Sequence, residues 1–410
     1  MTPTLAPQTS TRSGRFVTQP SGYRAFLPAP LPPDPPLVLD GDTLGLLSRA
    51  DVALGRLDGL VKVIPDPDFF VSMYVRREAV LSSQIEGTQS TLEDLLGAEL
   101  DTDAALSASD LTDVGDIVNY VRAMRHGLER LDELPLSLRL IREIHAELLR
   151  DGRGSRATPG EFRVSQNWIG PGGATLQQAT FVPPPVPEMR AALDDFERFF
   201  HSAERQPVLI EAALTHAQFE TIHPFLDGNG RVGRLLITFL LVHRDVLRAP
   251  LLYLSHYFKL HRAEYYDRLT AVRLKGDWEG WLQFFLQGVA MTAEEATETA
   301  ERIFELREQH RAIVIEEVGA GGLKLLSTLF DRPLVNVNFV TRALDVTFPT
   351  ANRLVGRFEE LGLLREVTGQ RRSRRFRYDP YLQLFDEPDS RDAELTPVQA
   401  TDADDAAVAP

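Results

Sequence analysis

Twelve consecutive residues, HPFLDGNGRVGR from His223 to Arg234, place an imidazole, a carboxylate, three glycines and two arginines directly before an apolar run, LLITFLLV. The tripeptide Gly228-Asn229-Gly230 can adopt backbone angles that most residues avoid, so successive N–H groups can turn inward as an anion-binding nest. The apolar run predicts a helix, and the N-terminus of a helix favours phosphate. The spacing therefore predicts a phosphate cradle.

Side chains around this cradle indicate what else it could hold. Arg231 and Arg234 are three residues apart and share one helix face, which suits more than one phosphate. Asp227 offers hard oxygen ligands and suits Mg²⁺, and His223 could act as a base toward an incoming hydroxyl. The alternative is a helix cap with a histidine of no chemical role. The chain contains neither G-x-x-x-x-G-K-[ST] nor H-E-x-x-H, which excludes a Walker A loop and a zincin site.

The elements that must position this motif are mostly helices. Helical periodicity begins near Thr43, and DFFVSMYVRREAVLSSQIEGTQSTLEDLL predicts two helices broken near Gly87. Further helices are predicted before and after the motif, up to about residue 318. The segment GEFRVSQNWIGPGGATLQQATFVPPP contains glycines, β-forming residues and prolines, which predicts a hairpin or an extended flap. Residues 1–36 are rich in proline and predict an extended arm.

Composition narrows the class of protein. The chain has 410 residues, 43% hydrophobic and 25% charged, which is typical of a globular protein of two or three domains. It has no cysteine, which excludes disulfides and thiolate sites. No secretory signal or membrane-length apolar run is present, so we expect a cytoplasmic protein.

The C-terminal region carries its own charge pattern. The net charge of the chain is −15, yet residues 321–378 have eleven Lys and Arg against five acids. VNVNFVTRALDVTFPTANRLVGRFEELGLL predicts helix, turn, helix, with Pro349 in a first helical turn, and REVTGQRRSRRFRY predicts a two-stranded wing. This winged helix-turn-helix could contact DNA through residues 321–378 or serve only packing and dimerisation. The acidic residues 386–410 predict a disordered tail.

The motif matches H-x-F-x-[DE]-G-N-G-R-x-x-R at every position, and the chain is thereby identified as resembling the Fic family. SGYRAFLPAPLPP, the predicted flap and the C-terminal helix-turn-helix are similar to segments of that family as well. The resemblance implies a mainly α fold: a Fic helical-bundle core with a β-hairpin flap, plus a C-terminal winged helix-turn-helix. We expect the arm at 1–36, a helical region with an inhibitory helix at 37–110, the Fic catalytic domain at 111–315, the winged domain at 316–385 and the tail at 386–410.

The resemblance also implies roles for single residues. Fic enzymes transfer AMP from ATP to a protein Ser, Thr or Tyr hydroxyl, and His223 matches their catalytic base and Asp227 their Mg²⁺ ligand. Phe225 matches a core anchor of the loop. Residues that match the nucleotide-binding set are Gly228, Asn229, Gly230, Arg231 and Arg234, with Ile169, Gly170, Tyr265 and Tyr266 as further candidates; a tyrosine pair at helical spacing is also common in cores.

A second element lies upstream. SSQIEG, from Ser82 to Gly87, matches the family's inhibitory pattern [ST]-x-x-x-E-[GN], with Gly87 ending a helix. By resemblance, Glu86 pairs with Arg234. If the Glu86 carboxylate made a bidentate bond to Arg234, this arginine could no longer bind the γ-phosphate. The carboxylate would also add negative charge where the triphosphate must lie. The alternative is an ordinary glutamate at a helix end.

The sequence therefore predicts a self-inhibited protein adenylyltransferase that uses ATP and Mg²⁺ to modify a target protein or itself, in a chain that could form a homodimer. Transfer of another group such as UMP or phosphocholine, and removal of AMP from a target, remain alternatives. The intact glycine motif argues against direct phosphorylation. A DNA-binding regulator with the Fic site as sensor is an alternative from another class.

Overall fold

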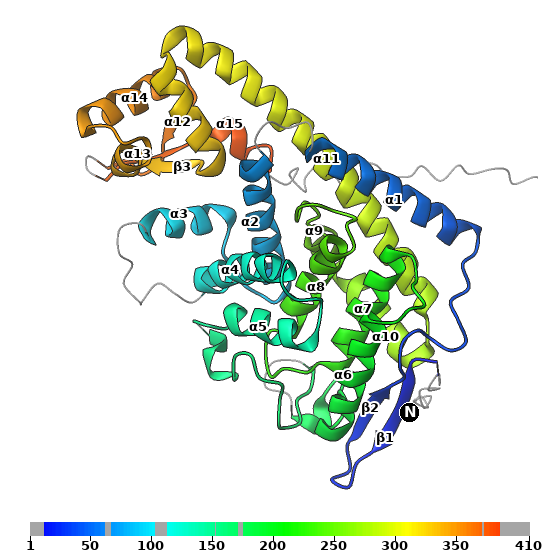
Figure 1. Ribbon diagram of the computed structural model, residues 1–410. Coiled ribbons are helices and arrows are strands. Elements are labelled where there is room, and N and C mark those ends of the chain that lie inside the picture. The colour runs from blue at the N-terminus through cyan, green and yellow to red at the C-terminus, as the bar shows by residue number, and fades with distance from the viewer. Residues whose placement is uncertain are drawn as a thin grey trace, which may run out of the picture.

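Helices dominate the part of the chain that the computed structural model describes, which is residues 12–61, 67–102, 113–151, 153–170, 175–370 and 373–385 (Figure 1). The predicted mainly α fold is confirmed. The helices N-terminal to the motif loop are α1 Gly41–Val61, α2 Pro67–Ile85, α3 Leu92–Thr102, α4 Asp113–Leu131, α5 Leu138–Leu148, α6 Val186–Phe200 and α7 Val208–Ile222. Those after it are α8 Asn229–His243, α9 Ser255–Leu260, α10 Arg262–Lys275 and α11 Trp278–Glu317. No helix in the described ranges is both long and apolar enough to cross a membrane.

The helices α7 and α8, on either side of the motif loop, form the centre of the core. Both are buried on nearly every face, as expected for helices with apolar residues all round. They pack on each other and on neighbours that include α4, α5, α6, α10 and α11. The motif loop is therefore held between two helices that cannot move independently of the core.

The helix α11 runs for 40 residues along the length of the molecule (Figure 1). Its N-terminal half is buried in the core, and α1 packs along it, with Arg49 Nη2 2.6 Å from Glu294 Oε2. Its C-terminal end carries a smaller unit. That unit contains α12 Ala320–Asp331, β3 Leu334–Asn336, α13 Val337–Leu344, α14 Phe348–Glu360, β4 Arg365–Glu366, β5 Arg375–Arg377 and α15 Asp379–Leu382.

In this C-terminal unit (residues 320–385), Pro349 lies in the first turn of α14, as the sequence predicts. The predicted two-stranded ribbon is present as β4 and β5, and β3 adds a third strand, so that the antiparallel sheet has the order β3-β5-β4. Its assignment as a winged helix, like the domain boundaries, stays a prediction.

The proline-rich N-terminal segment differs from the predicted extended arm. Residues Gly14–Thr18 and Arg24–Pro28 form an antiparallel hairpin, β1 and β2, in which Phe16 pairs with Phe26. Its second strand donates a hydrogen bond from Phe26 N to Val182 O at 2.9 Å, so the hairpin lies against the base of the flap. The physical reason is that the apolar Phe26 is fully buried there, which outweighs the extended preference of the flanking prolines. The predicted tail, residues 386–410, lies outside the described residues.

Candidate phosphate-binding site

The motif forms a tight loop between α7 and α8. His223 ends α7 in the left-handed conformation, at φ 50°, and Gly228 precedes α8 in the same region, at φ 78°. Val232 N bonds Gly228 O at 3.0 Å, which leaves the earlier N–H groups of α8 without an acceptor in the helix. Of the predicted tripeptide only Gly228 adopts a positive φ, while Asn229 and Gly230 are the first residues of α8. The loop therefore leads into a helix N-terminus as expected, and its binding of phosphate stays a prediction.

Side-chain amides and one arginine hold the loop in place. The Asn229 side chain accepts from Phe225 N and donates to Phe225 O, both at 2.9 Å. Asn167 Nδ2 donates to the same carbonyl at 2.7 Å, and the buried Arg163 donates from Nε to His223 O at 3.1 Å. Asn229 thus shapes the nest through its side chain. Sequence reasoning missed Arg163 and Asn167, because nothing distinguishes them from the other polar residues of the flap segment.

A second histidine, also missed by sequence reasoning, supports the loop from α5. His145 Nδ1 accepts from Gly160 N at 2.8 Å, so Nε2 carries the proton and donates to Asp227 O at 3.0 Å. Its ring stacks on Phe225, with centroids 3.7 Å apart. Phe225 is fully buried, as expected of a core anchor. His145 is therefore a positioning residue for the backbone that carries Asp227.

His223 presents a neutral imidazole to the site. Burial, with the nearby charges of Arg273 and Arg163, lowers the pKa of His223 to about 3. Its Nδ1 makes no hydrogen bond in the described part of the chain and lies 3.9 Å from Glu220 Oε2. At neutral pH the ring is therefore unprotonated, which is the form that a general base requires.

The segment SSQIEG, residues 82–87, meets the motif across 148 residues of sequence. Arg234 Nη2 donates to Glu86 Oε1 at 2.8 Å, while Arg234 Nε and Nη2 donate to Ser82 Oγ at 2.7 Å and Ser82 O at 2.9 Å. Only one N–H reaches Glu86, so the predicted bidentate bond is wrong: Ser82 accepts from Nε and shares Nη2 with Glu86. The helix α2 ends at Ile85, and Glu86 lies in the following turn with Gly87, whose φ is 98°.

Charge as well as geometry ties this pair together. Burial alone would raise the pKa of Glu86, but the charge and hydrogen bond of Arg234 outweigh it and lower that pKa. Glu86 in turn raises the pKa of Arg234, although burial opposes this. A Cβ on Gly230 would lie 2.1 Å from Glu86 Oε1, so this carboxylate occupies space directly against the nest. Glu86 and a phosphate bound in the nest would therefore compete for the same region.

Asp227 and Arg231 lie at the rim. The Asp227 side chain is 50% exposed; its Oδ1 accepts from Gly228 N at 2.6 Å and lies 3.6 Å from Arg231 Nη2. Arg231 is buried, with Nη1 3.9 Å from Asp116 Oδ2 of α4. No group of three or more His, Asp or Glu side chains able to hold a metal occurs within the described ranges. One exposed carboxylate beside a phosphate site still fits Mg²⁺, which takes one or two carboxylates and completes its shell with water and substrate phosphates.

The candidate nucleoside contacts divide between flap and core. Ile169 forms an isolated antiparallel bridge with Phe181, Gly170 is exposed, and the flap tip at residues 171–174 lies outside the described residues. Tyr265 is buried, with its hydroxyl 2.9 Å from His216 Nε2, which is the packing role that a tyrosine pair often has. Tyr266 is 41% exposed and remains the better placed of the two for a ligand.

Three arginines of the C-terminal unit pair with acids of α3. Arg375 Nη2 lies 2.7 Å from Asp101 Oδ2, and Arg377 Nη1 lies 2.6 Å from Glu93 Oε2. On the same helix, Glu99 Oε2 pairs with Arg332 Nη1 at 3.0 Å. Arg371 and Arg372 of the predicted wing lie outside the described residues. Of the four arginines expected to meet phosphates, Arg371, Arg372, Arg374 and Arg375, the structure pairs Arg375 with an acid of this chain.

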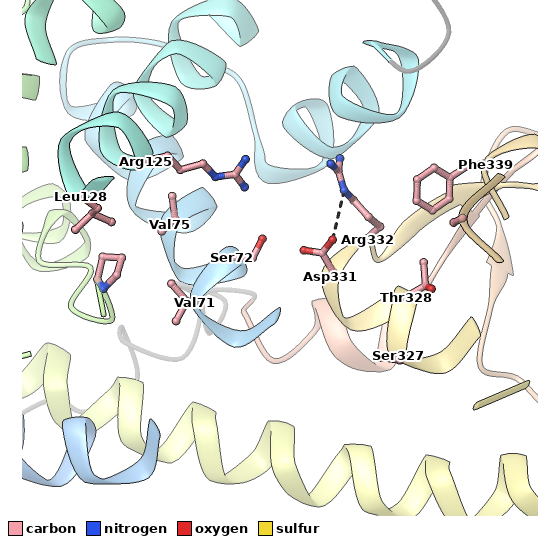
Figure 2. Close-up of a pocket in the computed structure, with 12 residues that line it drawn as sticks. Val71, Ser72, Val75, Arg125, Leu128, Ser327, Thr328, Asp331, Arg332 and Phe339 are labelled. Atoms are coloured by element: carbon pink, nitrogen blue, oxygen red, sulfur yellow. Dashed lines mark ion pairs between the residues drawn. The ribbon is translucent and has the colours of Figure 1, made fainter. Parts of the chain in front are cut away.

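A cavity of about 710 Å³ lies at the junction between the N-terminal helices and the C-terminal unit (Figure 2). Val71, Ser72 and Val75 of α2 line one side of it, while α12 and α13 line the other. None of the motif residues lines it. The cavity therefore marks where α2 meets the C-terminal unit and does not belong to the phosphate site.

Buried ionisable groups predict how stability changes with pH. Burial lowers the pKa of three histidines, to about 4 for His145 and to about 3 for His216 and His223. Burial raises the pKa of Glu78 and of Glu220 to about 7. Between pH 6.5 and 4.5 the three histidines are protonated in the unfolded chain but not in the folded chain. The two glutamates are protonated in the folded chain but not in the unfolded chain, so the unfolded chain binds one more proton in total. Below pH 4.5 the unfolded glutamates are protonated too, so only the histidine penalty remains.

For these five groups, we therefore expect their contribution to the free energy of unfolding to fall by about 1.4 kcal/mol per pH unit down to pH 4.5 and about threefold more steeply just below it. Urea unfolding at half-unit steps from pH 7 to 4 measures this. A constant slope through pH 4.5 would contradict the assignment.

The fold and the site define a class of protein: a helical core whose central loop sets a neutral histidine beside the N-terminus of a buried helix. Residues 44–129 match the family model described as Fic/DOC family N-terminal, and residues 135–241 match that of the Fic/DOC family. The chain belongs to the Fic/DOC family.

Relatives and one solved structure agree with this assignment. Protein adenylyltransferase Fic of Drosophila yakuba is 28% identical over 259 residues, 58% of this chain and 50% of that protein. The protein of the same name from Drosophila ananassae is 31% identical over 162 residues, 38% of this chain and 30% of that protein. The chain thus spans half or less of the length of these relatives. A Fic family protein from Desulfovibrio desulfuricans G20 has a TM-score of 0.55 at 20% identity, covering 84% of this chain and 97% of that chain, which shows a similar fold.

Proposed function

We propose that this chain is a protein adenylyltransferase that transfers AMP from ATP to a Ser, Thr or Tyr hydroxyl of a target protein or of itself, and that Glu86 inhibits it. The observation that carries the proposal is the hydrogen-bonded contact of Ser82 and Glu86 with Arg234, directly beside the motif loop. The relatives named protein adenylyltransferase support the activity.

In this proposal the loop binds the triphosphate and His223 activates the acceptor. The N–H groups at the start of α8 and the side chains of Arg231 and Arg234 hold the phosphates through charge-assisted hydrogen bonds. His223 takes the proton of the hydroxyl as its oxygen attacks the α-phosphorus, and pyrophosphate leaves. The neutral state of the ring, enforced by burial, suits this step.

Glu86 would inhibit by binding Arg234, the arginine that would otherwise bind the γ-phosphate. Its carboxylate takes one arm of Arg234 and lies against Gly230 in the nest, so ATP would meet a negative charge where its terminal phosphate should lie. The Glu86 side chain is 37% exposed, so it can leave Arg234 and move toward solvent. Inhibition would then be relieved wherever Glu86 is withdrawn.

Asp227 would hold Mg²⁺, which supplies neutralisation of the phosphate charge when bound. Asp227→Ala is expected to weaken the Mg²⁺ dependence of transfer, because the loop offers the ion no second carboxylate. Magnesium titrations of transfer in a Glu86→Gly background measure this, with Asp245→Ala, beyond the end of α8, as the control. Identical titrations for the Asp227 variant and its parent would disprove the metal role.

A mass-spectrometric search for added AMP tests the function directly. Wild type and Glu86→Gly are each incubated with Mg-ATP, alone and with cell extract, and the protein itself and the extract are searched for modified Ser, Thr and Tyr. We expect modification that increases in the variant and disappears when His223 is also replaced. Addition of a different group would support one of the other transfer reactions.

DNA binding through residues 321–378 is an alternative function that the structure does not favour. Arg375, one of the four arginines placed where a wing would meet phosphates, is paired with Asp101 of α3, and its neighbour Arg377 is paired with Glu93. The proposal is therefore confined to nucleotide transfer.

A further inference from the structure

Glu220 carries a buried carboxylate that the proposed reaction does not yet use. It lies three residues before His223 on α7, and its Oε2 is 3.9 Å from His223 Nδ1. Neither Glu220 Oε1 nor His223 Nδ1 makes a well-formed hydrogen bond among the described residues, although the backbone of Glu220 also interacts with the His223 ring. A Cβ on Gly233 would lie 2.8 Å from Glu220 Oε1, so α8 makes room for this carboxylate. Buried unpaired polar atoms cost free energy, and their retention beside the motif histidine indicates a use.

The surroundings of Glu220 leave its carboxylate available. The groups that act on its charge come from several elements: Arg234 from α8, Arg273 from α10 and Glu86 from the turn after α2. Tyr265 of α10 also interacts with it electrostatically. Arg273 donates its hydrogen bonds to other oxygens: Nη2 to the backbone carbonyl of Glu220 at 3.0 Å and Nε to the hydroxyl of Thr221 at 3.3 Å. The carboxylate is therefore near two cations but committed to neither.

We propose that Glu220 is a positioning residue that holds the Nδ1–H tautomer of His223 and shares the proton that the imidazole accepts. This inference rests on the proposed function. As the acceptor oxygen bonds to the α-phosphorus and the bond to pyrophosphate breaks, the hydroxyl proton moves to Nε2. The Nδ1 proton meanwhile bonds to Glu220, which compensates the positive charge of the ring. Nε2 later releases its proton to pyrophosphate or water.

The basicity of the two groups is complementary. Burial lowers the pKa of His223 to about 3, so the ring alone is a weak base near neutral pH. Burial raises the pKa of Glu220 to about 7, which places one proton-accepting step of the pair near neutrality. Together, His223 and Glu220 can thus accept a proton near neutral pH, where the isolated imidazole would stay unprotonated. The 3.9 Å separation would shorten when substrate orders the site, as catalytic hydrogen bonds often do.

Glu220→Gln, which keeps the shape and removes the charge, tests this in a Glu86→Gly background. We expect kcat to fall by about 10²-fold, with KM for ATP changed by less than about twofold. Glu220→Asp, which keeps the charge on a shorter chain, should lie in between and serves if the glutamine variant does not fold. Glu211→Gln is the matched control, because Glu211 is also a buried carboxylate of α7 but pairs with Arg244. An unchanged kcat in the glutamine variant would overturn the proposal.

A readout that needs no transfer separates this inference from the proposed function. Nitrogen-15 spectra of the His223 ring, assigned with His223→Ala, should show a change near pH 7 in the full chain and lose it in Glu220→Gln. If that step is present but no variant transfers AMP, the activity is wrong and the Glu220–His223 pairing stands. If both proteins show the same response near pH 7, Glu220 only fills space.

Discussion

Glu86→Gly is expected to raise AMP transfer well above the wild-type rate. The structure supplies the reason: Glu86 Oε1 bonds Arg234 at 2.8 Å and lies where any side chain on Gly230 would collide with it. Removing the carboxylate frees one arm of the guanidinium and removes a negative charge from the nest. The γ-phosphate can then take that place and align the α-phosphate for attack.

The same variant should lose only modest stability. Arg234 keeps its two hydrogen bonds to Ser82, so it is not left as an orphan, and the loss should stay below the roughly 3–5 kcal/mol of a broken buried pair. Mg-ATP should restore part of it, by about 2.7 kcal/mol at a hundredfold excess over Kd. Thermal unfolding with and without Mg-ATP measures this.

Two controls separate inhibition from a loosened turn. Gln84→Gly disturbs the same turn, where Gln84 Nε2 bonds Ser90 O at 2.9 Å, but leaves Glu86 in place, and it should not activate. Glu86→Gly/Arg234→Ala should lose the gain, because the freed arginine was its source. If Glu86→Gly modifies no acceptor faster than wild type, self-inhibition must be abandoned.

His223→Ala is expected to reduce transfer by ~10²–10⁴-fold, the usual contribution of a general base, while ATP binding stays nearly intact. Binding should survive because the nest is held by other groups: Asn229 braces the loop at Phe225, and the arginines come from α8. The comparison belongs in a Glu86→Gly background, where the rate is high enough to show the loss.

Calorimetric ATP titration and transfer rates, measured on the same preparations, test this split. His201→Ala is the control, since that histidine is exposed at the end of α6 and remote in sequence from the motif. Equal loss of binding and rate would mean that His223 shapes the loop. Full activity in the alanine variant would remove it from the chemistry altogether.

The sequence by itself determined the local parts of this site. Backbone freedom at Gly228 and the apolar run after Arg234 predict a turn leading into a helix, and the structure has the positive φ at Gly228 and the helix. The break after α2 near Gly87 was also readable, because a positive φ there suits glycine. These features depend on residues within one or two turns of each other, which is the range that periodicity and turn chemistry describe.

Contacts between distant segments were decided only by the tertiary structure. Sequence could match Glu86 to Arg234 through a family pattern, but packing of α2 on α8 decided that Ser82 shares the guanidinium. The N-terminal hairpin likewise exists because Phe26 finds a buried place beside the flap.

Buried polar partners followed the same rule. Arg163, Asn167 and His145 brace the loop from other elements. Glu220 lies near His223 through local i,i+3 spacing, but the room for its buried carboxylate depends on Gly233 of α8. An arginine, an amide or a carboxylate in sequence reads as a surface residue, since its burial depends on a partner that no local pattern names. The pairing of Arg375 and Arg377 with α3 shows this most plainly: residues that predict a nucleic-acid surface are satisfied within the chain.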